Sequence, residues 1–141
     1  MKEIAKGFIL ICAGFGLGFS AYAGVQIAQR KARNAVFVAE ASAELGRIRT
    51  AVAGFKKAKG RWPAGPRELV AAGLLDPANA PYERLRGSAN WVGSWDGQGG
   101  FFYDPGSGKA TLNADLRRQK FTASDWDRIR REELVPLETL N

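Results

Sequence analysis

An apolar stretch, FILICAGFGLGFSAYAGVQIA at residues 8–28, sets the organisation of the chain. No residue from Gly7 to Gln29 carries a charge. A helix of about 20 apolar residues spans the roughly 30 Å hydrocarbon core of a bilayer. We therefore predict a membrane-spanning helix over residues 8–28, although the small residues around Ala21 and Ala23 also resemble a secretory cleavage site. Because apolar character continues to Ile27 and a helical pattern follows without a break, we favour a retained helix.

Small residues recur along this helix at a spacing that supports close helix packing. Gly14 and Gly18 form one pair four residues apart, and Ser20 and Gly24 form another. Such pairs allow two membrane helices to approach closely. A helix that packs on other helices and a glycine-tolerant anchor without a partner both fit this spacing.

Residues 29–60 are predicted to continue the chain as an amphipathic helix. Apolar residues recur at intervals of three and four, as expected for one buried face of a helix; they are Val38, Ala41, Leu45, Ile48, Val52 and Phe55. No proline occurs before Pro63, so the two helical segments can form one continuous helix. Gly60 is a suitable residue to end it.

The remaining residues, 61–141, are predicted to form a small α+β region. A short helix at residues 66–72 would bury Leu69 and Val70. Three strands at residues 90–95, 101–103 and 109–113 are separated by glycine-rich turns, which predicts an antiparallel sheet. A C-terminal helix at residues 125–134 would be capped by Ser124, with Asp127 completing a capping box and Trp126 and Ile129 facing inward. Residues 135–141 are predicted to be irregular.

The composition argues against an enzyme. The 141 residues include no histidine and one cysteine, Cys12, so there is no His-based nucleophile pair or zinc site and no intrachain disulfide. Asp96 and Asp104 flank glycine-rich turns, where they are more typical of turns than of a calcium site. We expect no metal, no cofactor and no small-molecule substrate.

The net charge of +7 is unevenly distributed. Four units of it fall within residues 1–33, from five basic residues and one acid: Lys2, Lys6, Arg30, Lys31, Arg33 and Glu3. The basic residues beyond them are interspersed with acids, which is typical of a solvated surface. Binding to nucleic acid is therefore a minor alternative.

The segment Lys6-Gly7-Phe8, followed by Leu10 and Ile11, resembles the processing signal of type IV pilins and of the pseudopilins of type II secretion systems. The resemblance extends to about residue 114. It includes the Phe55 to Pro63 end of the long helix, and the strands around residues 99–105 and 108–113. It implies that residues 1–7 form a leader, that a prepilin peptidase cuts between Gly7 and Phe8, and that Phe8 becomes methylated. It also implies a pilin-like fold, in which the long helix packs on an antiparallel sheet.

Two features depart from that family. Cys12 occupies the position of the family's acidic residue, which pairs with a neighbouring subunit's amino terminus and which tip subunits can lack. The basic residues following the apolar stretch would, by the positive-inside rule alone, place the C-terminal region in the cytoplasm. Lysines also follow the apolar segment in major pseudopilins, and the resemblance implies a periplasmic or extracellular domain.

These observations lead to three functional hypotheses. The first is a structural subunit of a pilus-like or pseudopilus-like filament in the bacterial inner membrane, whose partners are other pilin-like subunits and a prepilin peptidase. The second is a DNA-binding minor pilin that serves DNA uptake. The third is a single-pass anchored scaffold that does not polymerise.

Overall fold

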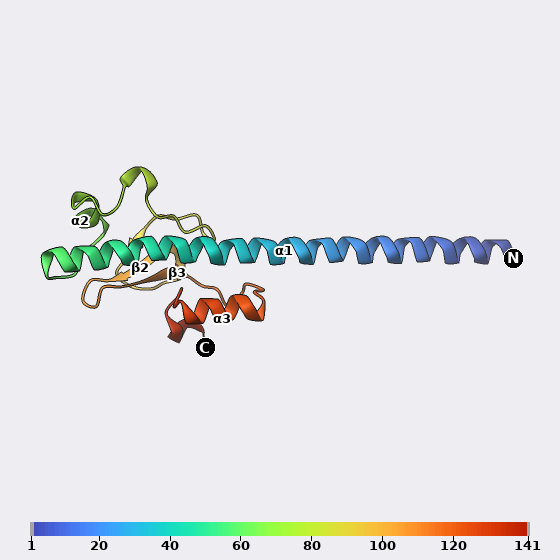
Figure 1. Ribbon diagram of the computed structural model, residues 1–141. Coiled ribbons are helices and arrows are strands. Elements are labelled where there is room, and N and C mark those ends of the chain that lie inside the picture. The colour runs from blue at the N-terminus through green and yellow to red at the C-terminus, as the bar shows by residue number, and fades with distance from the viewer. Residues whose placement is uncertain (1, 141) are drawn as a thin grey trace. The chain divides into compact units, whose positions relative to one another are not determined.

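A single helix, α1 (Lys2–Lys59), forms the first part of the chain, as Figure 1 shows. The computed structural model describes the backbone of residues 2–140 and the side chains of residues 22–140. The predicted join between the two helical segments is confirmed, since α1 runs through residues 28–30 without interruption. Gly60 ends the helix at φ 74°, and its N–H donates to the Lys56 carbonyl at 2.8 Å.

Residue contacts divide the chain into two units, Met1–Asn34 and Ala35–Asn141. The second unit is an α+β domain, which confirms the predicted class. After the end of α1 it contains α2 (Pro66–Ala71), a 3₁₀ turn η1 (Pro77–Asn79), strands β1 (Trp91–Val92), β2 (Gln98–Asp104) and β3 (Lys109–Ala114), α3 (Ala123–Arg131) and a second 3₁₀ turn η2 (Leu137–Leu140).

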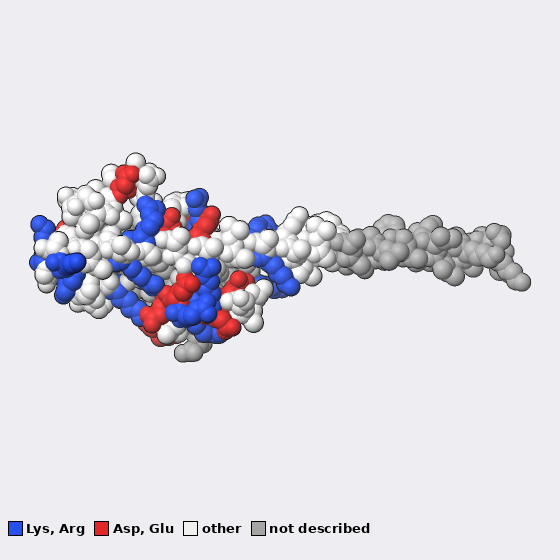
Figure 2. All heavy atoms as spheres, in the orientation of Figure 1, with Lys and Arg blue, Asp and Glu red and all other residues white. Residues whose placement is uncertain are grey.

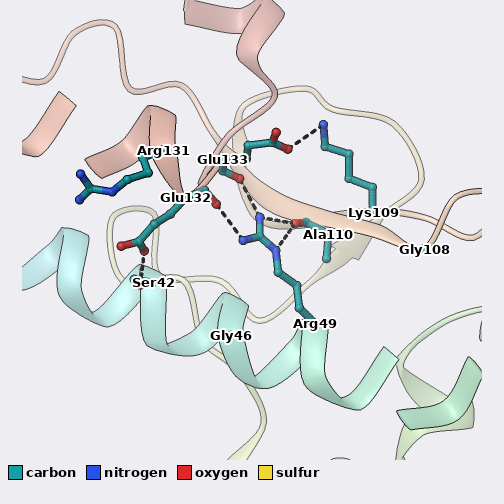
Figure 3. A pocket seen from close by; sticks show the side chains of 9 residues that line it. All are labelled: Ser42, Gly46, Arg49, Gly108, Lys109, Ala110, Arg131, Glu132 and Glu133. Atoms are coloured by element: carbon teal, nitrogen blue, oxygen red, sulfur yellow. Dashed lines mark hydrogen bonds and ion pairs between the residues drawn. The ribbon is translucent and has the colours of Figure 1, made fainter. Parts of the chain in front are cut away.

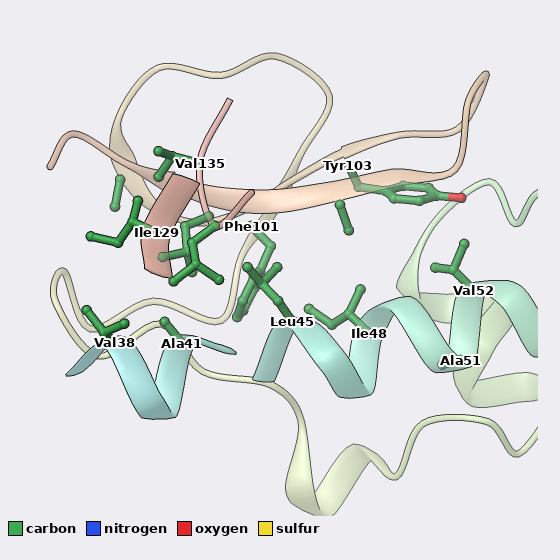
Figure 4. Packing of buried hydrophobic residues seen from close by; sticks show 14 of the residues in the cluster. Val38, Ala41, Leu45, Ile48, Ala51, Val52, Phe101, Tyr103, Ile129 and Val135 are labelled. Carbon is green, nitrogen blue, oxygen red and sulfur yellow. The ribbon is translucent and has the colours of Figure 1, made fainter. Parts of the chain in front are cut away.

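The predicted apolar stripe of α1 forms the centre of the domain core. All six residues of that stripe are buried. Leu45 and Ile48 point toward β2, the strand that carries Phe101 and Tyr103 (Figure 4). Leu69 of α2 and Ile129 of α3 also belong to this cluster. At roughly 2 kcal/mol for each large aliphatic side chain removed from water, this stripe is a main source of the domain's stability.

The sheet is mixed, and the prediction of a fully antiparallel sheet was wrong. The strand order is β1-β2-β3, with β2 antiparallel to β3 and β1 parallel to β2. The Phe101 N–H donates to the Asn90 carbonyl at 2.7 Å. Gly100, at φ 81°, permits this approach, because a Cβ there would lie 2.1 Å from that carbonyl oxygen. Strand β1 is only two residues long, and residues 93–97 connect it to β2.

Three smaller predictions also need correction. Val70 is 38% exposed, so Leu69 alone is buried in α2. The cap of α3 lies two residues earlier than predicted, and the helix begins at Ala123. Thr122 and Asp125, rather than Ser124 and Asp127, form the capping box. The backbone of Thr122 is extended and its hydroxyl accepts from the Asp125 N–H, which defines the helix start.

The C-terminal segment is ordered rather than irregular. Leu134 and Val135 are buried, and residues 137–140 form η2. The Leu134 carbonyl accepts from the Leu112 N–H at 2.6 Å, which attaches this segment to the edge of β3 opposite β2. Glu133 reaches φ 47° immediately before this bond, a rare conformation for a residue other than glycine.

Candidate functional site

Most residues of the predicted processing and helix-packing sites lie outside the described side chains. These are Gly7, Phe8, Gly14, Gly18 and Ser20. Gly24 is described, and apart from Gly24 itself and the adjacent residues of α1, no described atom lies within 4 Å of the position that a Cβ would take there. Among the described residues no helix has the length and apolar character needed to cross a membrane.

The described residues 22–33 of α1 form an exposed stretch. Tyr22, Val25 and Ile27 are 65%, 53% and 55% exposed. Arg30, Lys31 and Arg33 follow them directly and are exposed as well. Where exposed large apolar side chains form a contiguous patch, they mark a surface that contacts another molecule or a lipid phase. The open position at Gly24 leaves room for close approach there.

A polar cluster inside the domain joins three distant segments, and its centre is Arg49 of α1 (Figure 3). The guanidinium donates to the Ala110 carbonyl from Nε at 3.1 Å and from Nη2 at 3.0 Å. It also donates from Nη1 to the Glu132 carbonyl and from Nη2 to the Glu133 carbonyl, both at 2.8 Å. Partial burial lowers the pKa of Arg49 from its ordinary value. Arg49 therefore ties α1 to β3 and to the end of α3.

The side chains of the two glutamates extend this cluster. The Ser42 hydroxyl donates to Glu132 Oε2, and Arg128 Nε donates to Glu132 Oε1 at 2.9 Å. These contacts lower the pKa of Glu132, with the bond from Ser42 as the larger cause. Lys109 Nζ lies 3.2 Å from Glu133 Oε2. The positive and negative groups of the cluster are thus largely paired with one another.

A hollow of about 630 Å³ opens beside this cluster. Its lining comes from α1, from the start of β3 and from the end of α3: Ser42, Gly46, Arg49, Gly108, Lys109, Ala110, Arg131, Glu132 and Glu133. The donors of Arg49 are directed at backbone carbonyls rather than into the hollow. The arrangement therefore holds the C-terminal segment on the edge of β3, where Arg49 supplies the donors that an added strand would otherwise supply.

Arg49 and Ser42 were not identified from the sequence. Ser42, Leu45, Arg49 and Val52 recur at intervals of three and four, so Ser42 and Arg49 lie at the border of the buried stripe. A long cation at such a border covers apolar surface with its stem while its head reaches polar groups. This border position is the signal for Arg49 that the sequence contains. The carbonyls to which Arg49 donates belong to residues more than 60 positions away in the sequence.

The two aspartates considered for calcium are turn residues. Asp96 Oδ1 accepts from the Gln98 N–H at 3.0 Å and from Asn113 Nδ2 at 2.7 Å. Asp104 Oδ1 accepts from the Gly106 N–H at 2.9 Å. Within the part of the chain that the structure describes, no three metal-ligating acidic or cysteine side chains come together.

The basic clusters of the domain are mixed with acids, as Figure 2 shows for one face. Arg61 makes a two-pronged pair with Glu68 at 2.8 and 2.9 Å, which lowers the pKa of Glu68 to about 2. Arg117 pairs with Asp115 in the same way. These contacts match the solvated, mixed surface expected from the sequence.

Comparison with protein-family models, curated proteins and solved structures found no match.

Proposed function

We propose that the protein is a structural subunit of a pilus-like or pseudopilus-like filament, assembling through the N-terminal part of α1. The observation that carries this proposal is the exposure of Tyr22, Val25 and Ile27 on a helix whose sequence remains apolar back to Phe8. A continuous apolar helix surface that its own chain leaves uncovered gains stability from lipid or from the helices of other subunits.

The α+β domain supports the same proposal. It has its own buried core, which α1 enters at about Phe37, and it needs nothing from residues 22–33 to bury its stripe. In a filament subunit, the N-terminal part of α1 would pack with its counterparts, and the domain would form the outer layer. Before assembly that part of α1 would lie in the bacterial inner membrane, with the domain on the periplasmic side.

The first test is processing. We expect co-expression with a prepilin peptidase to give a product that begins at Phe8, detected by intact-mass spectrometry of the membrane-extracted chain. Gly7→Val should block the cut, because the resemblance places Gly7 directly before it. A chain that stays intact, or that is cut after Ala23, would contradict the proposal.

The second test is packing between copies. Cys12 is the single cysteine, so a disulfide-linked dimer formed by mild oxidation in membranes reports contact between the N-terminal helices of two chains. Gly24→Leu should lower the dimer yield severalfold, because close approach needs a small residue. Gly46→Leu is the matched control, since a Cβ at Gly46 also meets nothing within 4 Å. A monomer without cross-links would indicate an anchored scaffold instead.

A further inference from the structure

Three cations follow the exposed apolar side chains of α1 without any acid nearby in sequence. Arg30, Lys31 and Arg33 are exposed, and no acidic residue occurs between Glu3 and Glu40. None of the ion pairs among the described residues involves them. We call these three residues the basic collar. It is a local positive charge that the described part of the chain does not neutralise.

The position of the collar along the helix gives it a specific relation to the apolar side chains. At about 1.5 Å per residue, Arg30 lies only about 5 Å along the helix axis from Ile27 and about 12 Å from Tyr22. A tyrosine and a group of basic residues near the end of an apolar helix are typical of the region where a helix leaves a bilayer. There the rings and aliphatic stems stay in the apolar phase, and the cations reach the headgroups.

We propose that the basic collar binds the phosphate groups of anionic phospholipids where α1 leaves the membrane. The inference rests on the membrane residence contained in the proposed function, but not on filament assembly. The collar attracts the negatively charged membrane surface and fixes the depth of α1 in the bilayer. Each basic residue close to such a surface strengthens binding about fivefold, so the three together contribute about a hundredfold.

The exposed apolar side chains favour lipid over nucleic acid as the partner. A duplex offers phosphates but no apolar phase, and contact with it would leave Tyr22, Val25 and Ile27 in water. A bilayer surface satisfies both sets of side chains at once. In the domain, by contrast, Arg61 and Arg117 are already paired with acids.

The test compares two variants of the full chain that lose the same charge. Arg30→Gln, Lys31→Gln and Arg33→Gln together remove the collar. Lys57→Gln, Lys59→Gln and Arg67→Gln together form the control, because these three domain residues are also exposed and make no ion pair among the described residues. Each protein is diluted from detergent onto vesicles of phosphatidylcholine alone or of equal parts phosphatidylcholine and phosphatidylglycerol, and bound protein is measured by flotation.

We expect the wild-type chain and the control variant to prefer the phosphatidylglycerol vesicles by about a hundredfold at low salt, and this preference to fall as salt rises. The collar variant should bind both vesicle types equally. A collar variant that keeps the preference, a control variant that loses it equally, or a wild-type chain displaced by duplex DNA would overturn the inference.

The phosphatidylcholine arm separates this inference from the proposed function. Binding to phosphatidylcholine without a preference for phosphatidylglycerol refutes the collar alone. Failure to bind either vesicle refutes membrane residence, and with it both proposals.

Discussion

Two stretches of the same helix differ in what covers their apolar side chains. Residues 22–34 of α1 expose Tyr22, Val25 and Ile27, whereas residues 35–59 bury a regular stripe that includes Leu45 and Ile48. The arginines of the two stretches also differ in their contacts. Arg33 is exposed and makes no ion pair with any described residue, while Arg49 makes four hydrogen bonds to backbone carbonyls.

Helical periodicity alone therefore does not determine what a helix packs against. In residues 35–59 the partner is the sheet and the C-terminal segment of the same domain. In residues 22–34 the apolar side chains of Tyr22, Val25 and Ile27 are exposed, so burying them takes a partner other than the described residues. Substitutions in residues 35–59 should therefore change the stability of the isolated chain. Substitutions in residues 22–34 should change its association with other molecules.

The largest effect is expected from Leu45→Ala. Leu45 is fully buried, so the substitution should lower the free energy of unfolding by about 3 kcal/mol through lost burial and a residual cavity. Val25→Ala, in the exposed stretch, should leave it unchanged. Denaturant unfolding followed by tryptophan fluorescence measures both, because all four tryptophans lie in the second unit. Equal losses at the two positions would show that the two stretches of α1 contribute alike to the stability of the fold.

The second-largest effect is expected from substituting an arginine in each stretch, Arg49 and Arg33. Arg49→Met keeps much of the apolar stem but leaves the carbonyls of Ala110, Glu132 and Glu133 without these donors. We expect a loss of about 2 kcal/mol in unfolding free energy, since hydrogen bonds to a charged group are among the stronger ones. Arg33→Met should have no effect on the domain. A neutral or stabilising Arg49→Met would show that the cost of desolvating the guanidinium outweighs its hydrogen bonds.

The long helix was predictable because its information is local. The interval of three and four between Val38 and Phe55 and the lack of proline before Pro63 are enough to define α1 and its buried face. Gly60 and Leu69 were identified for the same reason, since a helix stop and a short amphipathic turn depend on neighbouring residues.

The sheet and the polar cluster depended on contacts between residues distant in sequence. The parallel pairing of β1 depends on Gly100 approaching the Asn90 carbonyl, which a glycine-rich turn does not reveal by itself. The capping residue was missed because Thr122 and Ser124 are both good caps, and the extended backbone at Thr122 decides between them. Arg49 was missed because its acceptors are backbone atoms of other segments, whose positions follow only from the folded chain.

The smallest expected effect is a pH dependence of the free energy of unfolding, which involves residues 35–59 of α1 and not residues 22–34. Residues 22–34 contain no acid, so acid conditions act on the fold through domain carboxylates such as Glu132. The hydrogen bond from Ser42 lowers the pKa of Glu132, so its stabilisation is present at neutral pH and is lost as the pH falls through that lowered pKa. Ser42→Ala should therefore lower the free energy of unfolding by about 1 kcal/mol at pH 7 and by progressively less below about pH 4.

Ser124→Ala, at an exposed position, is the control and should leave the free energy of unfolding unchanged at either pH. Chemical denaturation at the two pH values measures these differences. A loss in Ser42→Ala that does not change with pH would assign the effect to packing around Ser42 rather than to its bond with the ionised carboxylate.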